Sequence, residues 1–464
     1  MTFCLCITSI FPLFCHRHYN AEPRRLRIFG ADMTYRSVVF LNEYRPQLVF
    51  LGRWLLLSAV IGVLAGTASA GFLVALAWAT AWREAHPWVI WLLPFGGLLI
   101  GLMYHYFGGR SERGNNLILD EIHQPEATLP LRMAPLVLIG TVLTHLFGGS
   151  AGREGTAVQI GSTLADQLWR PLRLPRRERK LLLIAGISAG FASIFGTPLA
   201  GAVFGLEVFL IGRVRYDAIL PSFLAAISAD FVTRAWGTYA PTLGGLAHTH
   251  YPHLALPPAS VLGLLSAAGA GIAFGLAGRT FAGATHLVGA FYKKWIAYPP
   301  LRPVVGGAVV ALLVWTLGTT RYIGLGVPTI VESFGTALPP YAFALKILLT
   351  ALTLGASFKG GEVTPLFFVG ATLGNALALV LPLPLPLLAG MGFVAVFSGA
   401  TNTPLACTLM GLELFGAEAG LYIGLACVIS YLFSGHQGIY SAQIVGQSKN
   451  GLWGRQEGKR LREL

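Results

Sequence analysis

Long apolar runs without a single Asp, Glu, Lys or Arg constrain this chain more than any other feature. Three of them cover residues 54–82, 87–109 and 303–320. A helix needs about 20 apolar residues to cross the hydrocarbon core of a bilayer. Backbone polar groups in lipid must hydrogen bond within their own segment, so the runs predict helices. The sequence therefore predicts an all-α polytopic membrane protein and not a soluble enzyme.

The composition limits the partners that this chain can have. Only 11% of the residues are charged, yet the formal net charge is +13. Cytoplasmic loops of membrane proteins are rich in Lys and Arg, which accounts for the excess, and we expect no nucleic acid partner. The five cysteines have no paired metal-ligand spacing, so we expect no metal, no cofactor and no disulfide framework. The 57 glycines and 27 prolines indicate close helix contacts and broken helices.

The two ends of the chain differ from its apolar middle. Residues 1–15 are apolar but lack the basic start and the cleavage site of a signal peptide. A second methionine, Met33, leads directly into the first membrane helix, and our hypothesis is that it is the working start. We expect four parts, with both termini in the cytoplasm: an extension and cytoplasmic segment (1–46), a first transmembrane repeat (47–236), a second repeat (237–445) and a short basic tail (446–464).

The sequence contains an internal repeat. Residues 150–166 align with residues 359–375, which places Gly152 opposite Gly361. Further on, FGTPLAGAVFGLEVF (195–209) matches TNTPLACTLMGLELF (401–415). Self-similarity of this length indicates a duplication with halves of similar size.

The charges of two equivalent loops indicate the orientation of the halves. The loop after the first motif, WRPLRLPRRERK (169–180), is strongly basic, whereas its counterpart LVLPLPLPLL (379–388) has no charge. The positive-inside rule places the first loop in the cytoplasm and leaves the second outside. We therefore predict an inverted-topology repeat with broken helices that meet at the membrane midplane, as in transporters; an ordinary parallel duplication is the alternative.

Four glycine-rich breaks are candidates for the functional site. Each is expected to precede a helix, and the first N–H groups of a helix have no partner within it. Because the helix dipole makes that end positive, several such ends could hold an anion without a full positive charge. The breaks are Arg113-Gly114-Asn115-Asn116, GREGT (152–156), GGEVTP (360–365) and GHQGIYS (435–441).

Glu154 is placed where such an anion would bind. An ionised carboxylate can take the place of the anion, and after protonation it can move away, which would couple anion and proton movement. The alternatives are a structural Arg153–Glu154 pair or a helix cap. The overlapping GGSAG (148–152) fits the G-x-S-x-G elbow of hydrolases, with Ser150 as nucleophile, but that motif needs a strand before it, and none is evident here.

The breaks and the duplication together resemble the CLC family of anion channels and transporters, from about residue 54 to 443. The resemblance implies a homodimer with one pore per subunit, each built of two inverted halves. It implies that Glu154 is the external gating glutamate and that Tyr440 coordinates the central anion. The serine of the usual Gly-Ser-Gly-Ile-Pro is absent, and GREGT with GEVTP resembles the bacterial fluoride/proton antiporter branch. The expected anion-binding residues are Gly114, Asn115, Arg153, Gly155, Thr156, Val363, Thr364 and Tyr440.

Protons need a route from the cytoplasm. In the chloride exchangers of the family an internal glutamate matches position 208, where this chain has Val208. Our hypothesis is that Glu362 takes over this role and forms the proton route together with Glu154. We interpret Glu207 and Glu413, which are equivalent in the repeat, as structural. Arg113 departs from the expected neutral residue, and we expect it to face the cytoplasmic vestibule.

The predicted function follows from this resemblance. We expect a secondary transporter in the inner (plasma) membrane that exports fluoride in exchange for protons and is not an enzyme. The sequence has no ATP-binding motif, so the proton gradient is the expected energy source. The expected partners are fluoride or chloride, protons, membrane lipid and a second copy of the chain. A chloride/proton exchanger or a passive chloride channel is the alternative, and an intramembrane serine hydrolase is the remote one.

Overall fold

The computed structural model describes residues 32–239, 249, 251–252, 254 and 256–464. Residues 1–31, most of the predicted N-terminal extension, lie outside these ranges. Two units, Met1–Gly52 and Arg53–Leu464, follow from the contacts within the chain. In the first unit, the described residues are the beginning of helix α2 (Asp32–Ala85). The rest of α2 and the remaining described elements belong to the second unit.

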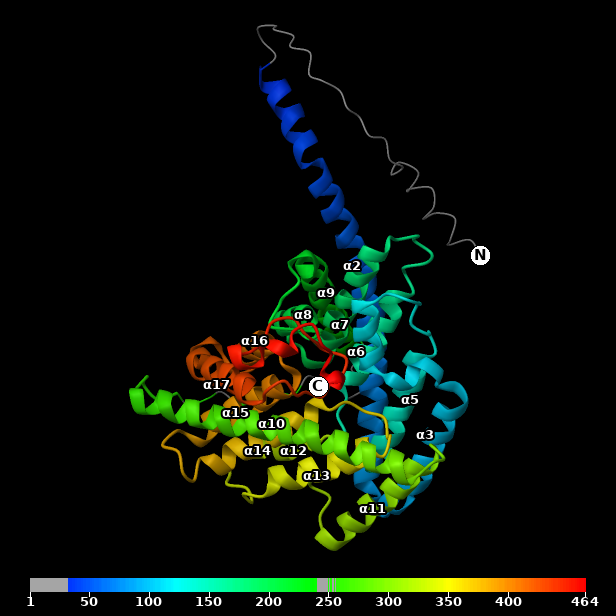
Figure 1. Cartoon of the computed structure of the whole chain (residues 1–464), viewed down its shortest axis with the longest axis vertical. Coiled ribbons are helices and arrows are strands. Elements are labelled where there is room, and N and C mark those ends of the chain that lie inside the picture. The colour runs from blue at the N-terminus through cyan, green and yellow to red at the C-terminus, as the bar shows by residue number, and fades with distance from the viewer. Residues whose placement is uncertain (1–31, 240–248, 250, 253, 255) are drawn as a thin grey trace. The chain divides into compact units, whose positions relative to one another are not determined.

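The second unit is mostly helical (Figure 1). The first half contains the rest of α2, then η2 (Pro87–Leu92), α3 (Leu93–Phe107), η3 (Gly109–Arg113), α4 (Asn115–His123), α5 (Met133–Leu146), α6 (Glu154–Asp166), α7 (Arg176–Phe195), α8 (Pro198–Glu207), β1 (Leu210–Ile211), η4 (Tyr216–Ala218) and α9 (Ile219–Tyr239). The predicted repeat boundary at 236/237 falls in the last turn of α9.

The second half contains one long helix followed by shorter ones (Figure 1). Its elements are α10 (Val261–Trp295), α11 (Leu301–Leu317), α12 (Val327–Glu332), α13 (Ala342–Gly355), α14 (Val363–Leu377), α15 (Leu385–Thr401), α16 (Pro404–Phe415), η6 (Ala417–Ala419), α17 (Gly420–Phe433), β2 (Ile444–Val445), η7 (Gly451–Gln456) and η8 (Leu461–Glu463).

The helix lengths fit a membrane protein with broken helices. Four helical segments among the described residues are long and apolar enough to cross a membrane: Tyr44–Ala85, Pro87–Phe107, Tyr216–Thr238 and Val261–Trp295. At 1.5 Å per residue, the 13 residues of α6 reach only about 20 Å, less than the roughly 30 Å of the hydrocarbon core. Large apolar side chains are exposed along α10, among them Leu265, Leu287 and Trp295, as expected for a surface that faces lipid. The predicted all-α membrane fold is confirmed.

Contacts between equivalent residues relate the two halves by a local two-fold axis. The Gly152 N–H donates to Gly361 O at 2.6 Å, and the Gly361 N–H donates to Gly152 O at 2.7 Å. The pair forms an antiparallel bridge. Two equivalent residues exchange the same contact only if a local two-fold axis passes between them, and an inverted-topology repeat has such an axis in the membrane plane. The glycines allow this approach, since a Cβ on Gly361 would lie 2.8 Å from the Gly155 nitrogen.

Glu207 and Glu413 repeat this reciprocity. The Glu413 carboxylate accepts from the Leu199 and Ala200 N–H groups at 3.0 and 2.8 Å. The Glu207 carboxylate accepts from the equivalent N–H groups of Leu405 and Ala406 at 3.1 and 2.9 Å. Each glutamate thus binds the first turn of the other repeat's helix, α16 or α8, where donors lack intrahelical partners. These contacts agree with the structural role that the sequence indicated.

Replacing Glu413 with alanine is therefore expected to destabilise the folded protein. The change leaves two N–H groups at the start of α8 without a partner, and loss of an N-terminal cap costs about 1–2 kcal/mol. The thermal unfolding midpoint in detergent, followed by Trp fluorescence, should fall below that of Glu418→Ala, which removes an exposed carboxylate close by. Equal midpoints for the two variants would contradict the capping role.

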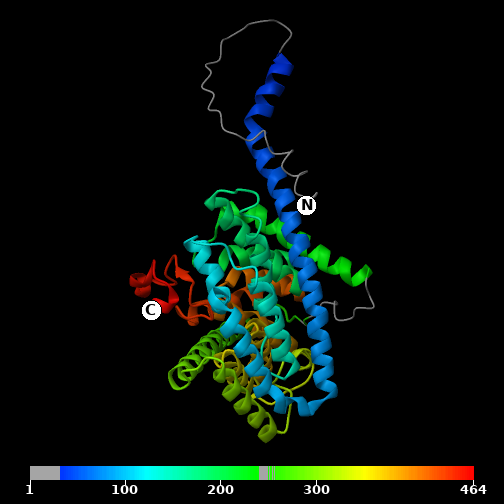
Figure 2. The same cartoon turned by 90° about the vertical axis from the view of Figure 1, so that its right-hand side faces the viewer.

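The fourth glycine-rich break does not precede a helix, contrary to the prediction. Its backbone donors bind partners from other elements: the Ile439 N–H donates to Ala400 O at 2.9 Å, and the Ala442 N–H donates to Asn116 Oδ1 at 3.0 Å. A helix would need these donors for its own carbonyl groups. The chain instead continues into β2, which pairs in parallel with β1 through Leu210–Ile444 and Ile211–Val445. The C-terminal segment lies at the surface, red in Figures 1 and 2.

Candidate functional site

Three helix N-termini carry the predicted site residues. Helix α4 begins after Gly114, α6 begins at Glu154 after Arg153, and α14 begins at Val363 after Glu362. None of the three has a side-chain cap from its own N-cap residue, so their first N–H groups are available to other acceptors. Gly114 has φ +55° and ψ −134°, a conformation that favours glycine.

The loop before α6 is fixed by hydrogen bonds on both sides. Ser150 Oγ is buried, donates to Tyr322 O at 3.1 Å and lies 2.9 Å from Thr350 Oγ1. The His145 ring nitrogens lie 2.8 Å from Thr141 O and 3.0 Å from Ala151 O. Ser150 and His145 are thus each held by other groups, and the loop presents Glu154 in one defined position.

The Glu154 carboxylate occupies the N-terminus of α14. Its Oε2 accepts from the Thr364 N–H at 3.0 Å and from the Arg153 N–H at 3.1 Å. The Thr364 hydroxyl lies 2.6 Å from both carboxylate oxygens. The Glu154 side chain is only 1% exposed. A glutamate at the start of one broken helix is therefore bound by the start of the equivalent broken helix, where the positive end of the dipole favours an anion.

Arg153 is close to Glu154 but forms no close ion pair with it. Arg153 Nε lies 3.7 Å from Glu154 Oε1 and has no hydrogen-bond partner among the described residues. The Arg153 side chain is 17% exposed. The carboxylate thus depends mainly on neutral donors, and the guanidinium adds a positive potential from a greater distance. This arrangement differs from a tight structural Arg153–Glu154 pair.

Glu362 and Asn115 approach the same glycine. A Cβ on Gly155 would lie 3.0 Å from Asn115 Nδ2 and 3.8 Å from Glu362 Oε2. Glu362 therefore lies beside the first turn of α6, next to the glycine that follows Glu154 in the chain, and near the amide of Asn115. Asn115 Oδ1 is buried without a hydrogen-bond partner among the described residues. The structure thus brings the two carboxylates and a polar amide together at the contact of the two repeats.

Tyr440 and Asn115 line a small cavity of about 10 Å³, near the lower limit for a single water molecule. The rest of the lining is apolar and comprises Ile118, Leu119, Val158, Ile187, Phe204 and Val208. Val208, the position at which the family resemblance led us to look for an internal glutamate, therefore faces this cavity. The Tyr440 side chain is 3% exposed.

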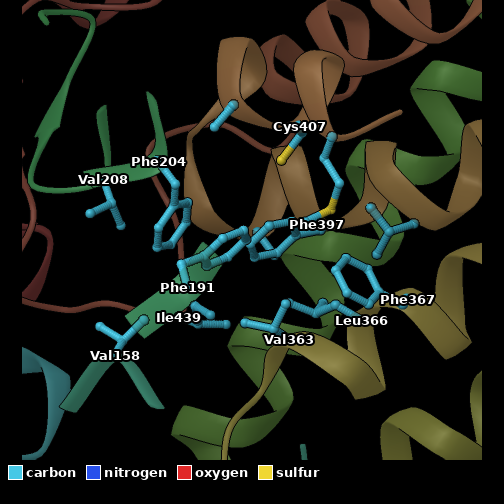
Figure 3. Close-up of a cluster of buried hydrophobic side chains, with 14 of the residues drawn as sticks. Val158, Phe191, Phe204, Val208, Val363, Leu366, Phe367, Phe397, Cys407 and Ile439 are labelled. Carbon is cyan, nitrogen blue, oxygen red and sulfur yellow. The ribbon is translucent and has the colours of Figure 1, made fainter. Parts of the chain in front are cut away.

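Apolar side chains from both repeats surround the site (Figure 3). Phe191, Phe204 and Phe397 pack against one another, with ring centroids of Phe191 4.4 Å from Phe204 and 6.1 Å from Phe397, and those of Phe204 and Phe397 5.8 Å apart. Val363 and Ile439 point toward the same cluster (Figure 3). Apolar surroundings of this kind strengthen the electrostatic interactions within the site, because little water is present to screen them.

Three predicted residues make contacts that the sequence did not indicate. The Thr156 hydroxyl is 2.7 Å from the Thr141 hydroxyl, which holds it to α5. Val363 contributes to the apolar cluster through its side chain, because it is the first residue of α14 and is 1% exposed. Arg113 pairs with Asp120, two turns along α4, because the helix places that carboxylate within its reach.

Sequence reasoning missed a buried ion network at the far ends of α4 and α6. Arg179 is fully buried and donates to Asp166 at 2.7 Å and to Glu121 at 3.0 Å. The network fixes the two helices whose other ends carry Asn115 and Glu154. Arg179 stands in the basic loop 169–180, and nothing in the sequence distinguishes it from its arginine neighbours there. Arg179 differs from its neighbours only because the packing of α7 on α4 and α6 buries it beside Glu121 and Asp166.

An inverted repeat with broken helices that meet near its middle is an architecture found among membrane transport proteins. Residues 96–435 match the voltage gated chloride channel family. The chain is 56% identical, over 88% of its length and 90% of the relative's, to a chloride/fluoride channel protein of Pseudomonas syringae pv. tomato. It is 28% identical to the voltage-gated ClC-type chloride channel ClcB of Escherichia coli, over 82% of this chain and 96% of that one.

Solved structures agree with this assignment. A CLC-type fluoride/proton antiporter superimposes with a TM-score of 0.80 at 37% identity, covering 85% of this chain and 98% of the other. A slow cyanobacterial chloride/proton antiporter superimposes with a TM-score of 0.70 at 20% identity, covering 82% and 94%, which is a likeness of fold. The protein belongs to the voltage gated chloride channel (CLC) family, as the sequence motifs predicted.

Proposed function

We propose that this protein exports fluoride in exchange for protons, with Glu154 as the gating residue. The observation that carries the proposal is the position of the Glu154 carboxylate, which accepts hydrogen bonds from the Thr364 N–H, the Thr364 hydroxyl and the Arg153 N–H. An anion that binds to these donors must displace the carboxylate. Protonation removes the carboxylate's charge and favours that displacement, so each exchange of ligands moves a proton.

The size and chemistry of the site favour fluoride over chloride. Fluoride is about as large as a water molecule and chloride is clearly larger, while the cavity beside Asn115 is near the limit for one water. Fluoride is also a strong hydrogen-bond acceptor, and the donors of Thr364 are those that bind a carboxylate here. Two relatives, one a chloride/fluoride channel protein and the other a CLC-type fluoride/proton antiporter, support this choice.

Glu362 is proposed as the second proton-transfer residue. Its carboxylate lies beside Gly155, next in sequence to Glu154, whereas the place of the internal glutamate is taken by Val208. A carboxylic acid so close to the gating residue can pass a proton to it without a long side-chain path. The alternative of a chloride/proton exchanger would lack an acid at the usual internal position.

We further propose that the protein is not an enzyme, works as a homodimer and lies in the plasma membrane with both termini in the cytoplasm. The family resemblance supports the dimer and the basic loop 169–180 supports the orientation. Against the intramembrane hydrolase, Ser150 hydrogen bonds to Tyr322 and Thr350, and the nitrogens of His145 face other groups.

The deciding experiment is anion efflux from liposomes that contain the purified protein. Fluoride and chloride efflux are compared in parallel vesicles while the external pH is recorded. We expect fluoride efflux with proton uptake, at least 10 times faster than chloride efflux, since a tenfold preference needs only about 1.4 kcal/mol. Equal chloride flux would place the protein with the chloride transporters, and fluoride flux without proton movement would make it a channel.

A further inference from the structure

Lys449 inserts a buried ammonium group into a set of oxygen atoms. Its Nζ donates to Asn402 Oδ1 at 2.5 Å, to Tyr431 O and Gly435 O at 2.6 Å each, and to Ser434 Oγ at 3.0 Å. The Nζ also lies 4.0 Å from the centroid of the Tyr431 ring. Among the described residues no carboxylate lies within ion-pair distance of this Nζ. The charge is therefore held by neutral oxygens and a ring face alone.

These oxygens belong to the ends of two helices. Tyr431 and Gly435 lie at the C-terminus of α17, where carbonyl groups have no intrahelical donor and the dipole is negative. Asn402 ends α15 in the left-handed conformation, with φ 60° and ψ 39°. A cation at this point satisfies free carbonyls of α17 and at the same time binds the cap of α15. It links the two helices that precede and support the Tyr440 loop.

Asn402 connects Lys449 to the segment that carries Tyr440. The Asn402 Nδ2 donates to Gln443 Oε1 at 3.1 Å and to Gln437 O at 3.3 Å. Gln443 in turn donates to Val208 O at 2.6 Å and to Thr401 O at 2.7 Å. Gln437 and Gln443 flank Tyr440, so the amide of Asn402 bridges both sides of its loop.

The Tyr440 hydroxyl itself has no hydrogen bond to any described residue. Its position therefore depends on the backbone of residues 435–443, which the contacts of Asn402 and Gln443 hold. Loss of the ammonium would leave Asn402 Oδ1 and the Gly435 carbonyl without their donor, while the Tyr431 carbonyl would keep only the Ser434 hydroxyl. Asn402 could then turn away from Gln443, and the loop would lose one of its fixed points.

We infer that Lys449 is a positioning residue for Tyr440, and thereby sets the affinity of the central site for the transported anion. The inference rests on the proposed function for the identity of that anion, and on the family resemblance for the role of Tyr440 in binding it. Lys449 lies outside the residues that exchange protons. Its loss should therefore weaken anion binding without changing the number of protons moved per anion.

The test compares Lys449→Met, which keeps the length of the side chain and removes its charge, with the wild type and with Lys459→Ala. Lys459 is an exposed lysine of the same C-terminal segment. In liposomes we expect Lys449→Met to raise the half-saturating anion concentration about 10-fold, with the maximal rate and the proton-to-anion ratio retained, while Lys459→Ala behaves as wild type. An unchanged half-saturating concentration, or a changed proton-to-anion ratio, would overturn the inference.

Chemical rescue separates positioning from a general loss of structure. Lys449→Ala leaves a space lined by four oxygens that a methylammonium ion can fill, whereas tetramethylammonium has no N–H to donate. Equilibrium anion binding in detergent, where no pH gradient exists, should recover with methylammonium and not with tetramethylammonium. Absence of recovery in a folded variant would contradict the inference.

If neither lysine variant folds, Asn402→Asp provides the second test. It keeps the acceptor for Lys449 and removes the amide that donates to Gln443 and Gln437. We expect the same rise in half-saturating concentration, and wild-type affinity in this variant would refute the route through Asn402. The comparison uses whichever anion the wild type transports, so a failure of the fluoride assignment is visible in the wild type alone.

Discussion

Replacing Glu154 with alanine is expected to abolish proton coupling completely. In the folded protein the Glu154 carboxylate accepts hydrogen bonds from the Thr364 N–H and hydroxyl and from the Arg153 N–H. Without it, an anion can occupy these donors at any pH and no proton need move. Fluoride should then pass down its own gradient, and proton uptake should fall to that of liposomes without protein.

The measurement is simultaneous recording of fluoride efflux and external pH. Glu418→Ala is the matched control, because it makes the same change at an exposed carboxylate. Glu154→Gln adds a second comparison, since its amide keeps the size of a protonated glutamate but can neither bind nor release a proton. Proton uptake against the gradient in Glu154→Ala would rule out Glu154 as the gating residue.

Replacing Glu362 with glutamine is expected to reduce proton-coupled transport to background while the protein stays folded. Glu362 is the residue before α14, and its Oε2 lies 3.8 Å from the point where a Cβ of Gly155 would be. The substitution is nearly equal in volume, so packing beside Gly155 should be preserved. The protein would lose only the carboxylate that we propose as the second proton-transfer residue.

Thermal unfolding and transport must be measured together for this variant. Glu84→Gln is the control, because Glu84 is 61% exposed and lies at the end of α2. We expect both variants to unfold within a few degrees of the wild type and only Glu362→Gln to lose proton movement. Proton coupling that persists in Glu362→Gln would show that Glu362 is not on the proton route. A route through the region of Val208 would then be the alternative.

The starts of three broken helices were predictable because their signals are local. A glycine-rich run followed by an apolar run indicates a helix that begins at that point, and α4, α6 and α14 begin as predicted. The same pattern failed at residues 435–441. There the backbone donors bind Ala400 and Asn116, which lie far away in the sequence. A tertiary partner outweighed the local preference.

Thr156 illustrates why the contacts of site residues were harder to predict than helix starts. In the sequence it stands two residues after Glu154, and only the packing of α5 on α6 places the Thr141 hydroxyl 2.7 Å from its own. Lys449 shows the reverse case. It stands among exposed basic residues of the tail, and only the meeting of the α15 and α17 ends makes it a buried ammonium.

The sequence by itself determined the membrane-spanning class, the duplication, its inversion and the family. Each of these depends on hydropathy, loop charge or motif order, which need no knowledge of distant contacts. The tertiary structure decided which donors bind Glu154, how Glu207 and Glu413 cap each other's helices and where the Tyr440 loop is held. All of these contacts join residues of different helices, most of them of different repeats, so their energies exist only after the two halves have packed against each other.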